Sequence, residues 1–273
     1  MLVLPLASAA LIGAAAGAAE ALAVTRTDRV VPLPGLPSAL ADLRIAHVSD
    51  LHLGAPGVNA SAGRRAVGLV QQAEPDLVAI TGDLLSHPRG VDVLYEVLDG
   101  LSAPLGVFAV LGNHDLGDAR DPFARAGAIP DLAPVGVELL RDRSTVVVRD
   151  GVSIAVSGID PHRPSVVADG LPFGWPSVAA DLHVVLAHYP DVFGGAPDDA
   201  RGIVLAGHLH GGQICVPWPS GRVRLSQLGE GYEDGVYQRG ALVLHVSRGV
   251  GTTLVPFRLF ARPEVTIIRL VCA

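Results

Sequence analysis

The chain has 273 residues, of which 49% are hydrophobic and 17% are charged. This composition excludes a disordered or fibrous protein, and the length matches one large α/β domain or two small ones. The net charge of -7 gives no support to a nucleic-acid-binding role, so no nucleic-acid partner is expected. Two cysteines are too few for a disulfide framework.

The chain begins with an apolar segment, residues 1–24, in which Glu20 is the only charged residue. Its length matches that of a membrane-spanning helix, although its alanines and glycines make it weakly hydrophobic. The alternatives to a retained anchor are a signal cleaved near Ala18, a helix lying on or within other structure, and a misassigned start. An anchor is favoured, so we expect membrane association through this segment. Arg26 and Arg29 would then keep the catalytic domain on the cytoplasmic side.

Residues 25–42 contain Pro32, Pro34, Gly35 and Pro37. Proline and glycine at this density exclude a regular helix and predict an extended linker. No break in composition follows, so residues 43–273 are expected to form a single catalytic domain.

From residue 43 onward, short apolar runs alternate with segments of helical periodicity, as is typical of α/β proteins. Helices are predicted at Ala62–Gln72, Val91–Leu101 and Asp121–Ala126. The predicted strands are Arg44–Ser49, Leu77–Thr81, Gly106–Leu111, Thr145–Arg149, Ser153–Ser157, Leu182–Ala187, Gly202–Ala206, Ala241–Ser247 and Glu264–Val271.

The connections between these strands predict how the strands pair. The first three strands are separated by helices, which favours parallel pairing. The later strands are joined by glycine-rich turns, which favours antiparallel hairpins, one of them across Asp150 and Gly151. A mixed, layered α/β sandwich is therefore expected.

Polar residues that bind metals follow several of the predicted strands, where open α/β sheets place their ligands. They occur in the segments SDLHLG, TGDLL, LGNHD, VVLAHYP and IVLAGHLHGG. The resulting set contains oxygen and nitrogen donors and no thiolate, which suits divalent Mn, Fe or Zn. The candidate ligands are Asp50, His52, Asp83, Asn113, His188, His208 and His210.

The size of this set predicts two ions rather than one. A single tetrahedral zinc takes three or four protein ligands and would leave several buried donors without a partner. Two ions about 3.5–4 Å apart, bridged by one carboxylate, would use all seven. In Asp50-Leu51-His52 and His208-Leu209-His210, the two-residue spacing turns both polar side chains the same way.

Each cluster alone has a simpler interpretation as a hydrogen-bonded loop, but five of them in this order, each after a strand, favour a shared site. The other histidines lack such a pattern. His47, His183 and His245 lie inside predicted strands and are expected to be packing residues. His87 and His162 lie in proline-containing loops and are left outside the site.

These motifs resemble those of the calcineurin-like metallophosphoesterases: D-x-H, G-D, G-N-H-D, a single His and G-H-x-H. The resemblance covers residues 43–270, and the segments GYEDGVYQRG and HVSRGVGT look like small bacterial members that carry an amino-terminal membrane segment. Some of that subgroup hydrolyse UDP-2,3-diacylglucosamine or act as phosphodiesterases. The resemblance implies an αββα sandwich of two mixed β-sheets flanked by helices, with a dinuclear centre at one edge.

The resemblance also implies a role for each site residue. Asp83 would bridge the two ions, a hydroxide bridging the ions would attack phosphorus, and His114, oriented by Asp115, would protonate the leaving group. The segment LLSHPRG lacks the D-R-G of phosphoprotein phosphatases, which speaks against a protein phosphatase. Asp50, His52 and His210 would hold the first ion, and Asn113, His188 and His208 the second.

The expected function is therefore metal-dependent hydrolysis of a phosphoester, most simply a phosphodiester. Lipid-linked and sugar-nucleotide esters are the candidate substrates. If the amino-terminal segment is an anchor, a lipid-linked or envelope phosphodiester is favoured over a soluble nucleotide. The alternative is a non-catalytic metal-binding scaffold that kept the fold and lost the chemistry, because fold does not fix function.

Overall fold

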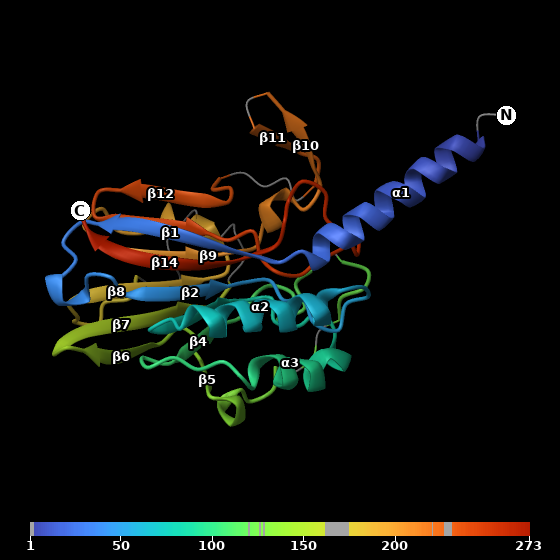
Figure 1. Ribbon diagram of the computed structural model, residues 1–273. Coiled ribbons are helices and arrows are strands. Elements are labelled where there is room, and N and C mark those ends of the chain that lie inside the picture. The colour runs from blue at the N-terminus through green and yellow to red at the C-terminus, as the bar shows by residue number, and fades with distance from the viewer. Residues whose placement is uncertain are drawn as a thin grey trace.

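The computed structural model describes residues 3–119, 121–125, 127, 129–161, 175–219, 221–226 and 231–273. Two six-stranded mixed sheets pack face to face, and helices cover the outer face of one of them (Figure 1). The expected sandwich of two mixed sheets with flanking helices is confirmed.

The first sheet has the strand order β1-β14-β2-β3-β4-β5. Its pairs are parallel except for β14 and β2, so β2, β3 and β4 are mutually parallel as predicted. The strands are β1 (Thr25–Leu33), β2 (Arg44–Val48), β3 (Leu77–Thr81), β4 (Val107–Val110), β5 (Val137–Leu139) and β14 (Glu264–Cys272).

The second sheet has the order β12-β13-β9-β8-β7-β6. The antiparallel hairpin of β6 and β7 was predicted, but the prediction of further hairpins is wrong for β7–β8, β8–β9 and β9–β13, which are parallel. The segments between these strands are long enough to return the chain to the starting edge, as parallel pairing requires. The strands are β6 (Ser144–Arg149), β7 (Val152–Ile159), β8 (Leu182–Ala187), β9 (Gly202–Ala206), β12 (Gly235–Arg239) and β13 (Leu242–Val246).

The described α-helices are α1 (Val3–Leu22), α2 (Asn59–Ala73) and α3 (Val91–Leu98). The helix predicted at 121–126 is wrong for its described part, residues 121–125. There Asp121 Oδ1 accepts a hydrogen bond from the main-chain N–H of Phe123, which favours a turn. Short 3₁₀ turns are η1 (Ser38–Leu40), η2 (Pro88–Gly90), η3 (Ala133–Val135), η4 (Pro190–Phe193) and η5 (His210–Gly212).

The apolar core lies in layers. Between the sheets, side chains such as Ile45 and Phe108 of the first sheet pack with Val184 and Leu205 of the second. The apolar faces of α2 and α3 pack on the outer face of the first sheet. On the outer face of the second sheet, the described apolar cover comes from η4 and neighbouring aromatic residues.

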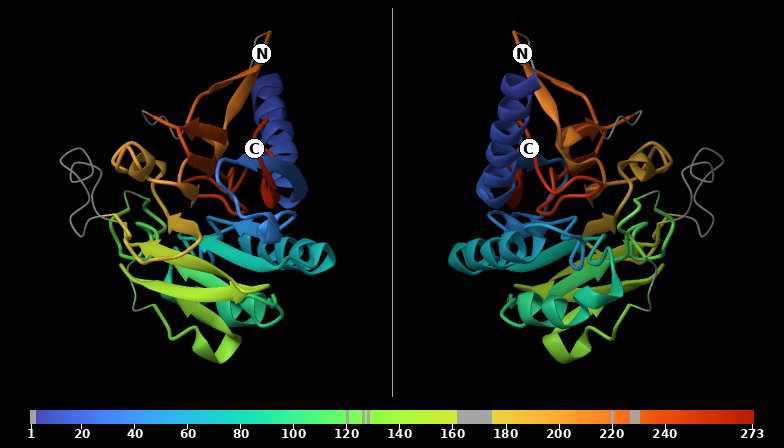
Figure 2. Two further views of the ribbon diagram at one scale, coloured as in Figure 1. Left: turned by 90° about the vertical axis from the view of Figure 1, so that its left-hand side faces the viewer. Right: turned by 90° about the vertical axis from the view of Figure 1, so that its right-hand side faces the viewer.

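The amino-terminal elements differ in part from expectation. The segment 25–33, expected to be an extended linker, is extended but forms the edge strand β1 along the whole length of β14. Helix α1 and the hairpin of β10 (Cys215–Trp218) and β11 (Gly221–Arg224) extend from the same side of the molecule (Figure 2). In the part of the chain that the structure describes, no helix combines the length and apolar character needed to cross a membrane.

Candidate metal centre

The seven candidate ligands converge at one edge of the sandwich. They follow β2, β3 and β4 of the first sheet and β8 and β9 of the second. Parallel neighbours end at the same edge of a sheet, and for this reason residues more than 150 positions apart meet there. Six of the seven side chains are buried, and His208 is half-buried.

The backbone around the centre is strained. Asp50, His52, Asp83, His208 and His210 have φ angles of 57°, 48°, 52°, 82° and 49°, in the left-handed region that non-glycine residues rarely adopt. Such strain persists where the surrounding structure imposes it, and it is concentrated at functional sites.

Two glycines allow the chain to approach these side chains closely. A Cβ atom on Gly112 would lie 2.0 Å from Asp83 Oδ1, and one on Gly207 would lie 2.5 Å from Asp50 Oδ2. No larger residue fits at either position unless a candidate ligand moves. The glycines of GNHD and GHLH are therefore part of the site's construction.

One half of the centre is formed by Asp50, His52 and His210. The Nε2 atoms of His52 and His210 lie 2.9 Å apart, and His210 Nε2 lies 3.6 Å from Asp50 Oδ1. His52 Nε2 lies 3.4 Å from Asp83 Oδ2. These nitrogen and oxygen atoms face a common point.

The other half is formed by Asn113, His188 and His208. His188 Nε2 lies 3.0 Å from Asn113 Oδ1 and 3.1 Å from His208 Nδ1. It also lies 3.3 Å from Asp83 Oδ2. The same carboxylate oxygen of Asp83 therefore faces both halves.

The chemistry of these donors fits two divalent cations. Groups of three donors, each with ligand atoms within 4.8 Å of one another, include Asp50 with His52 and His210, and Asp50 with Asp83 and His188. Burial lowers the pKa of His52 and of His208 to about 3, so both rings are neutral and keep a lone pair for a cation.

Burial and neighbouring charges shift the pKa values of the ionisable side chains in the centre. Burial raises the pKa of Asp50 to about 6, because no bulk water solvates its charged form. Burial lowers the pKa of His188, but the charge and hydrogen bond of Asp83, the charge of Asp50 and the hydrogen bond to Thr81 O together outweigh this effect and raise the pKa to about 9. A cation at the centre would replace the proton on His188 and compensate the carboxylates.

His114 and Asp115 lie at the edge of the centre but differ from the expected pair. The ring of His114 stands edge-on to that of His52, with centroids 4.5 Å apart, and its Nδ1 lies 3.3 Å from Ser86 Oγ. The carboxylate of Asp115 instead accepts hydrogen bonds from the main-chain N–H groups of Leu84, Leu85 and Gly112. The expected orientation of His114 by Asp115 is therefore corrected.

Asp115 holds two loops together, because a carboxylate can accept hydrogen bonds from several main-chain N–H groups that lie close to one another. One loop follows Asp83, and the other contains Asn113. Ser86 takes the place expected for Asp115, and its Oγ also lies 2.8 Å from His52 Nδ1. Sequence reasoning missed Ser86, although it stands three residues after Asp83 in the same loop.

Two further residues beside the centre gave no clear sequence signal. Asn59, at the start of α2, donates to the main-chain oxygens of His52 and Thr252. Arg258 donates to the main-chain oxygen of His210. In the sequence, Asn59 is distinguished only as a polar residue at the start of a helix. Arg258 is distinguished only as a charged residue in an otherwise apolar segment.

The histidines expected outside the site are described except for His162, which lies outside the described residues. His47 and His245 are buried between the sheets with their Nδ1 atoms 2.8 Å apart. His87 is half-buried and its side chain accepts a hydrogen bond from Arg89 N. His183 on β8 is half-buried, and none of these four described histidines lies in the candidate groups of ligands.

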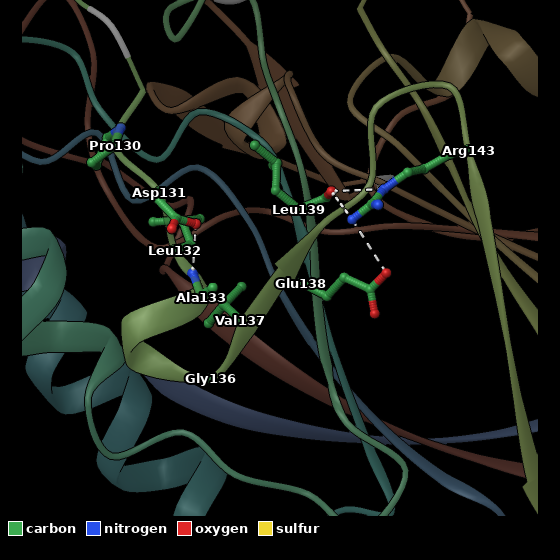
Figure 3. Close-up of a pocket in the computed structure, with 9 residues that line it drawn as sticks. All are labelled: Pro130, Asp131, Leu132, Ala133, Gly136, Val137, Glu138, Leu139 and Arg143. Atoms are coloured by element: carbon green, nitrogen blue, oxygen red, sulfur yellow. Dashed lines mark hydrogen bonds and ion pairs between the residues drawn. The ribbon is translucent and has the colours of Figure 1, made fainter.

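A separate hollow of about 380 Å³ lies beside β5 and η3 (Figure 3). Its cationic residue, Arg143, pairs with Glu138 at 3.2 Å and donates to the main-chain oxygen of Leu139. The charges that line the hollow are thus used within the chain, and it contains no candidate ligand.

Comparison with known proteins identifies the family. The model of the calcineurin-like phosphoesterases matches residues 43–212, and this range contains all seven candidate ligands. The chain is 30% identical over 237 residues to the metallophosphoesterase YkoQ of Bacillus subtilis, covering 85% of this chain and 84% of that protein.

Two relatives have names that state an activity. The phosphodiesterase YaeI of Escherichia coli is 30% identical over 234 residues, which cover 85% of this chain and 83% of that protein. The UDP-2,3-diacylglucosamine pyrophosphatase LpxG of Chlamydia muridarum is 27% identical over 306 aligned positions, which cover 91% and 89%. The fold and the clustered donors, with these likenesses, define a metal-dependent hydrolase of phosphoric esters. The chain belongs to the calcineurin-like phosphoesterase family.

Proposed function

We propose that this chain hydrolyses a phosphodiester at a centre of two divalent cations held by the seven converging side chains. The observation that carries the proposal is the position of Asp83, whose Oδ2 lies 3.4 Å from His52 Nε2 and 3.3 Å from His188 Nε2. Asp83 would bridge the cations. Asp50, His52 and His210 would hold one cation, and Asn113, His188 and His208 the other.

The cations, when bound, lower the pKa of water and neutralise charge on the phosphoryl oxygens. The chain's own residues orient the substrate and move a proton. His114, next to His52 at the edge of the centre, is placed to donate a proton to the oxygen of the leaving group. Ser86 holds the ring of His114 through Nδ1, which leaves Nε2 for the substrate. Asp115 fixes the loops that carry Asp83 and Asn113.

For the substrate we propose an ester with an apolar or lipid-linked part. A hollow of about 80 Å³ is lined mainly by apolar residues, among them Pro56, Phe123 and Leu254, and Thr252 forms part of its wall. Asn59 connects its wall to the centre, because its amide donates to the main-chain oxygens of both His52 and Thr252. The named activities of YaeI and LpxG, a phosphodiesterase and a pyrophosphatase acting on an acylated sugar nucleotide, support the same class.

The test is hydrolysis of bis-p-nitrophenyl phosphate, with Mn²⁺, Fe²⁺ and Zn²⁺ supplied separately to metal-stripped protein. The three ions are the ones that the donor set suits. Asp83→Asn should lose both bound ions and turnover, because an amide does not supply the shared negative charge. Asp198→Asn, an exposed aspartate changed in the same way, should behave as the wild type.

Two outcomes would contradict the proposal. Full metal content with full activity in Asp83→Asn would exclude the bridging role. Two bound ions without hydrolysis of nucleotide, sugar-nucleotide or phospholipid esters would favour the non-catalytic scaffold.

Membrane association through residues 1–24 is a further part of the proposal. Residues 1–19 carry no charged side chain, and α1 extends away from the sandwich (Figure 1). Arg26 and Arg29 follow the segment and would keep the catalytic domain on the cytoplasmic side. Cell fractionation with a carbonate wash tests this. Recovery of the full chain in the supernatant before any wash would overturn it.

A further inference from the structure

Arg258 is a buried cation in the loop between β13 and β14, and its side chain is 0% exposed. The described acceptors of its guanidinium are four main-chain oxygens and the Nδ1 atom of His210, and none of them is a carboxylate. Burying a charge without a counter-charge is costly, so a fold that keeps one must gain from its hydrogen bonds. The identity of its partners indicates what that gain is.

The guanidinium connects a candidate ligand to two loop segments. Nη1 donates to the main-chain oxygens of His210, Arg248 and Ala261 at 3.2, 2.8 and 3.0 Å. Nε and Nη2 both donate to the oxygen of Gly251, and Nη2 lies 3.2 Å from His210 Nδ1. Five donor contacts to four carbonyl groups need the planar, forked guanidinium, which lysine lacks.

The segment 248–252 that Arg258 holds also supports the other two ligands of the same half. Val250 N donates to Ser49 O and Gly251 N donates to Asp50 O. A Cβ atom on Gly249 would lie 2.8 Å from Asp50 Oδ2, so this segment packs directly on Asp50. Thr252 is joined to His52 through the side chain of Asn59. Arg258 therefore braces all three ligands of one half.

The other half rests on different contacts. His188 Nδ1 lies 2.9 Å from Thr81 O, and Asn113 Nδ2 donates to Asp118 O. Neither contact involves Arg258 or the segment that it holds. The two halves meet at one contact, because the main-chain N–H of His208 donates to the carboxylate of Asp50, 3.2 Å from each oxygen.

Helix α1 holds the backbone that carries Arg258. The main-chain N–H of Arg258 donates to Gly17 O at 3.0 Å. The carboxylate of Glu20 accepts from the N–H groups of Phe260 and Ala261. The bracing arginine is therefore fixed on both sides, by α1 and by the loops of the centre.

We propose that Arg258 is a positioning residue that holds Asp50, His52 and His210 in place for one of the two cations and affects the other cation less, through the contact between Asp50 and His208 alone. The inference rests on the proposed metal assignment. Contacts that orient metal ligands from outside typically contribute about 10–100-fold to metal affinity. The loss of Arg258 should therefore weaken one binding event by that factor.

The test is calorimetric titration of metal-stripped protein with Mn²⁺. The wild type should show two binding events. Arg258→Met should show one event weakened by about 10–100-fold and a clearly smaller loss in the other event. Arg258→Lys, with fewer and differently arranged donors, should show a smaller loss in the weakened event. Arg269→Met removes an exposed arginine that pairs with Asp42 and should bind as the wild type does.

The outcomes of the titration distinguish a failure of the positioning role of Arg258 from a failure of the proposed metal assignment. A wild type that binds no Mn²⁺ would refute the metal assignment. Wild-type affinity for both ions in Arg258→Met, or an equal loss in both events, would refute only the positioning role. Circular dichroism in chelator shows whether each variant is folded. If Arg258→Met is unfolded, Arg258→Lys, which keeps the charge, decides by the same criteria.

Discussion

His114 lies at the edge of the centre, with a ring nitrogen within 4.8 Å of ligand atoms of His52 and Asp83. Its proposed role is that of a proton donor and not of a ligand, so its contribution should be separable from metal binding. Its ring contacts His52 edge-on, and its Nδ1 faces Ser86 Oγ. We expect His114→Ala to bind both cations and to lose about 10²–10⁴-fold in turnover, the usual contribution of a positioned proton donor. Metal analysis and the rate with a diester substrate measure the two effects on one sample.

A matched control is His87→Ala, which removes a half-buried histidine outside the candidate groups of ligands and should keep both properties. A second substrate with a p-nitrophenolate leaving group sharpens the result, because such a group needs little protonation. His114→Ala should lose less with this substrate than with an alkyl ester. An equal loss with both substrates would contradict the role as acid.

At the scale of the elements, a polar contact joins the two sheets. His47 on β2 and His245 on β13 face each other with Nδ1 atoms 2.8 Å apart, and His47 Nε2 lies 2.8 Å from Thr81 Oγ1 on β3. The contact requires at least one neutral ring, because one nitrogen must accept the proton that the other donates. Burial lowers the pKa of His245 to about 4.

This contact predicts a loss of stability in acid. The folded-state pKa of His245 lies below its ordinary value of 6.5, so the unfolded chain takes up the proton first. The stabilisation is complete above pH 6.5 and falls as the pH decreases toward 4, by about 3 kcal/mol in all. Urea unfolding of metal-stripped protein across this range measures it.

His245→Asn should have a shallower pH dependence over the same range, because it removes one titrating ring. His183→Asn is the comparison, since His183 lies on β8 and is only partly buried. A slope in His245→Asn equal to that of the wild type would show that the acid sensitivity comes from other groups.

The sequence predicts elements well where the signal is local. Buried runs of alternating or continuous apolar residues predicted β2, β3, β8 and β9 nearly to the residue. The short strands β5, β10 and β11 were missed because their side chains are largely exposed or half-buried. Edge strand β1 was missed because its prolines indicate a linker, and proline is tolerated at a sheet edge.

The candidate site, too, could be predicted only where the sequence signal is local. The ligands were predicted because each follows a strand in a glycine-containing motif, and such motifs are local. The partners of Asp115 and Arg258 are main-chain atoms, and main-chain groups leave no mark on the sequence. The pairing of β9 with β13 decides which loops meet at the candidate site. Turn residues alone did not predict this pairing.

At the scale of the whole molecule, the centre joins the two sheets. Asp50 and Asp83 follow strands of the first sheet, whereas His188 and His210 follow or come close after strands of the second. Cations that bind only the folded arrangement stabilise it, by about 2.7 kcal/mol for each site at a concentration 100 times the dissociation constant. Metal binding should therefore act on global stability and not only on the loops.

We expect saturating Mn²⁺ to raise the Tm of metal-stripped protein by at least about 5–10 °C, since 1 kcal/mol shifts a domain of this size by roughly 2–4 °C. Differential scanning calorimetry with Mn²⁺ and with EDTA measures the difference. Asp83→Asn should show little of this shift, because the oxygen that faces both halves is replaced. The full shift in Asp83→Asn would place the stabilising ion elsewhere. In Arg258→Met, about half of the shift should persist, because only one of the two ions would lose its support.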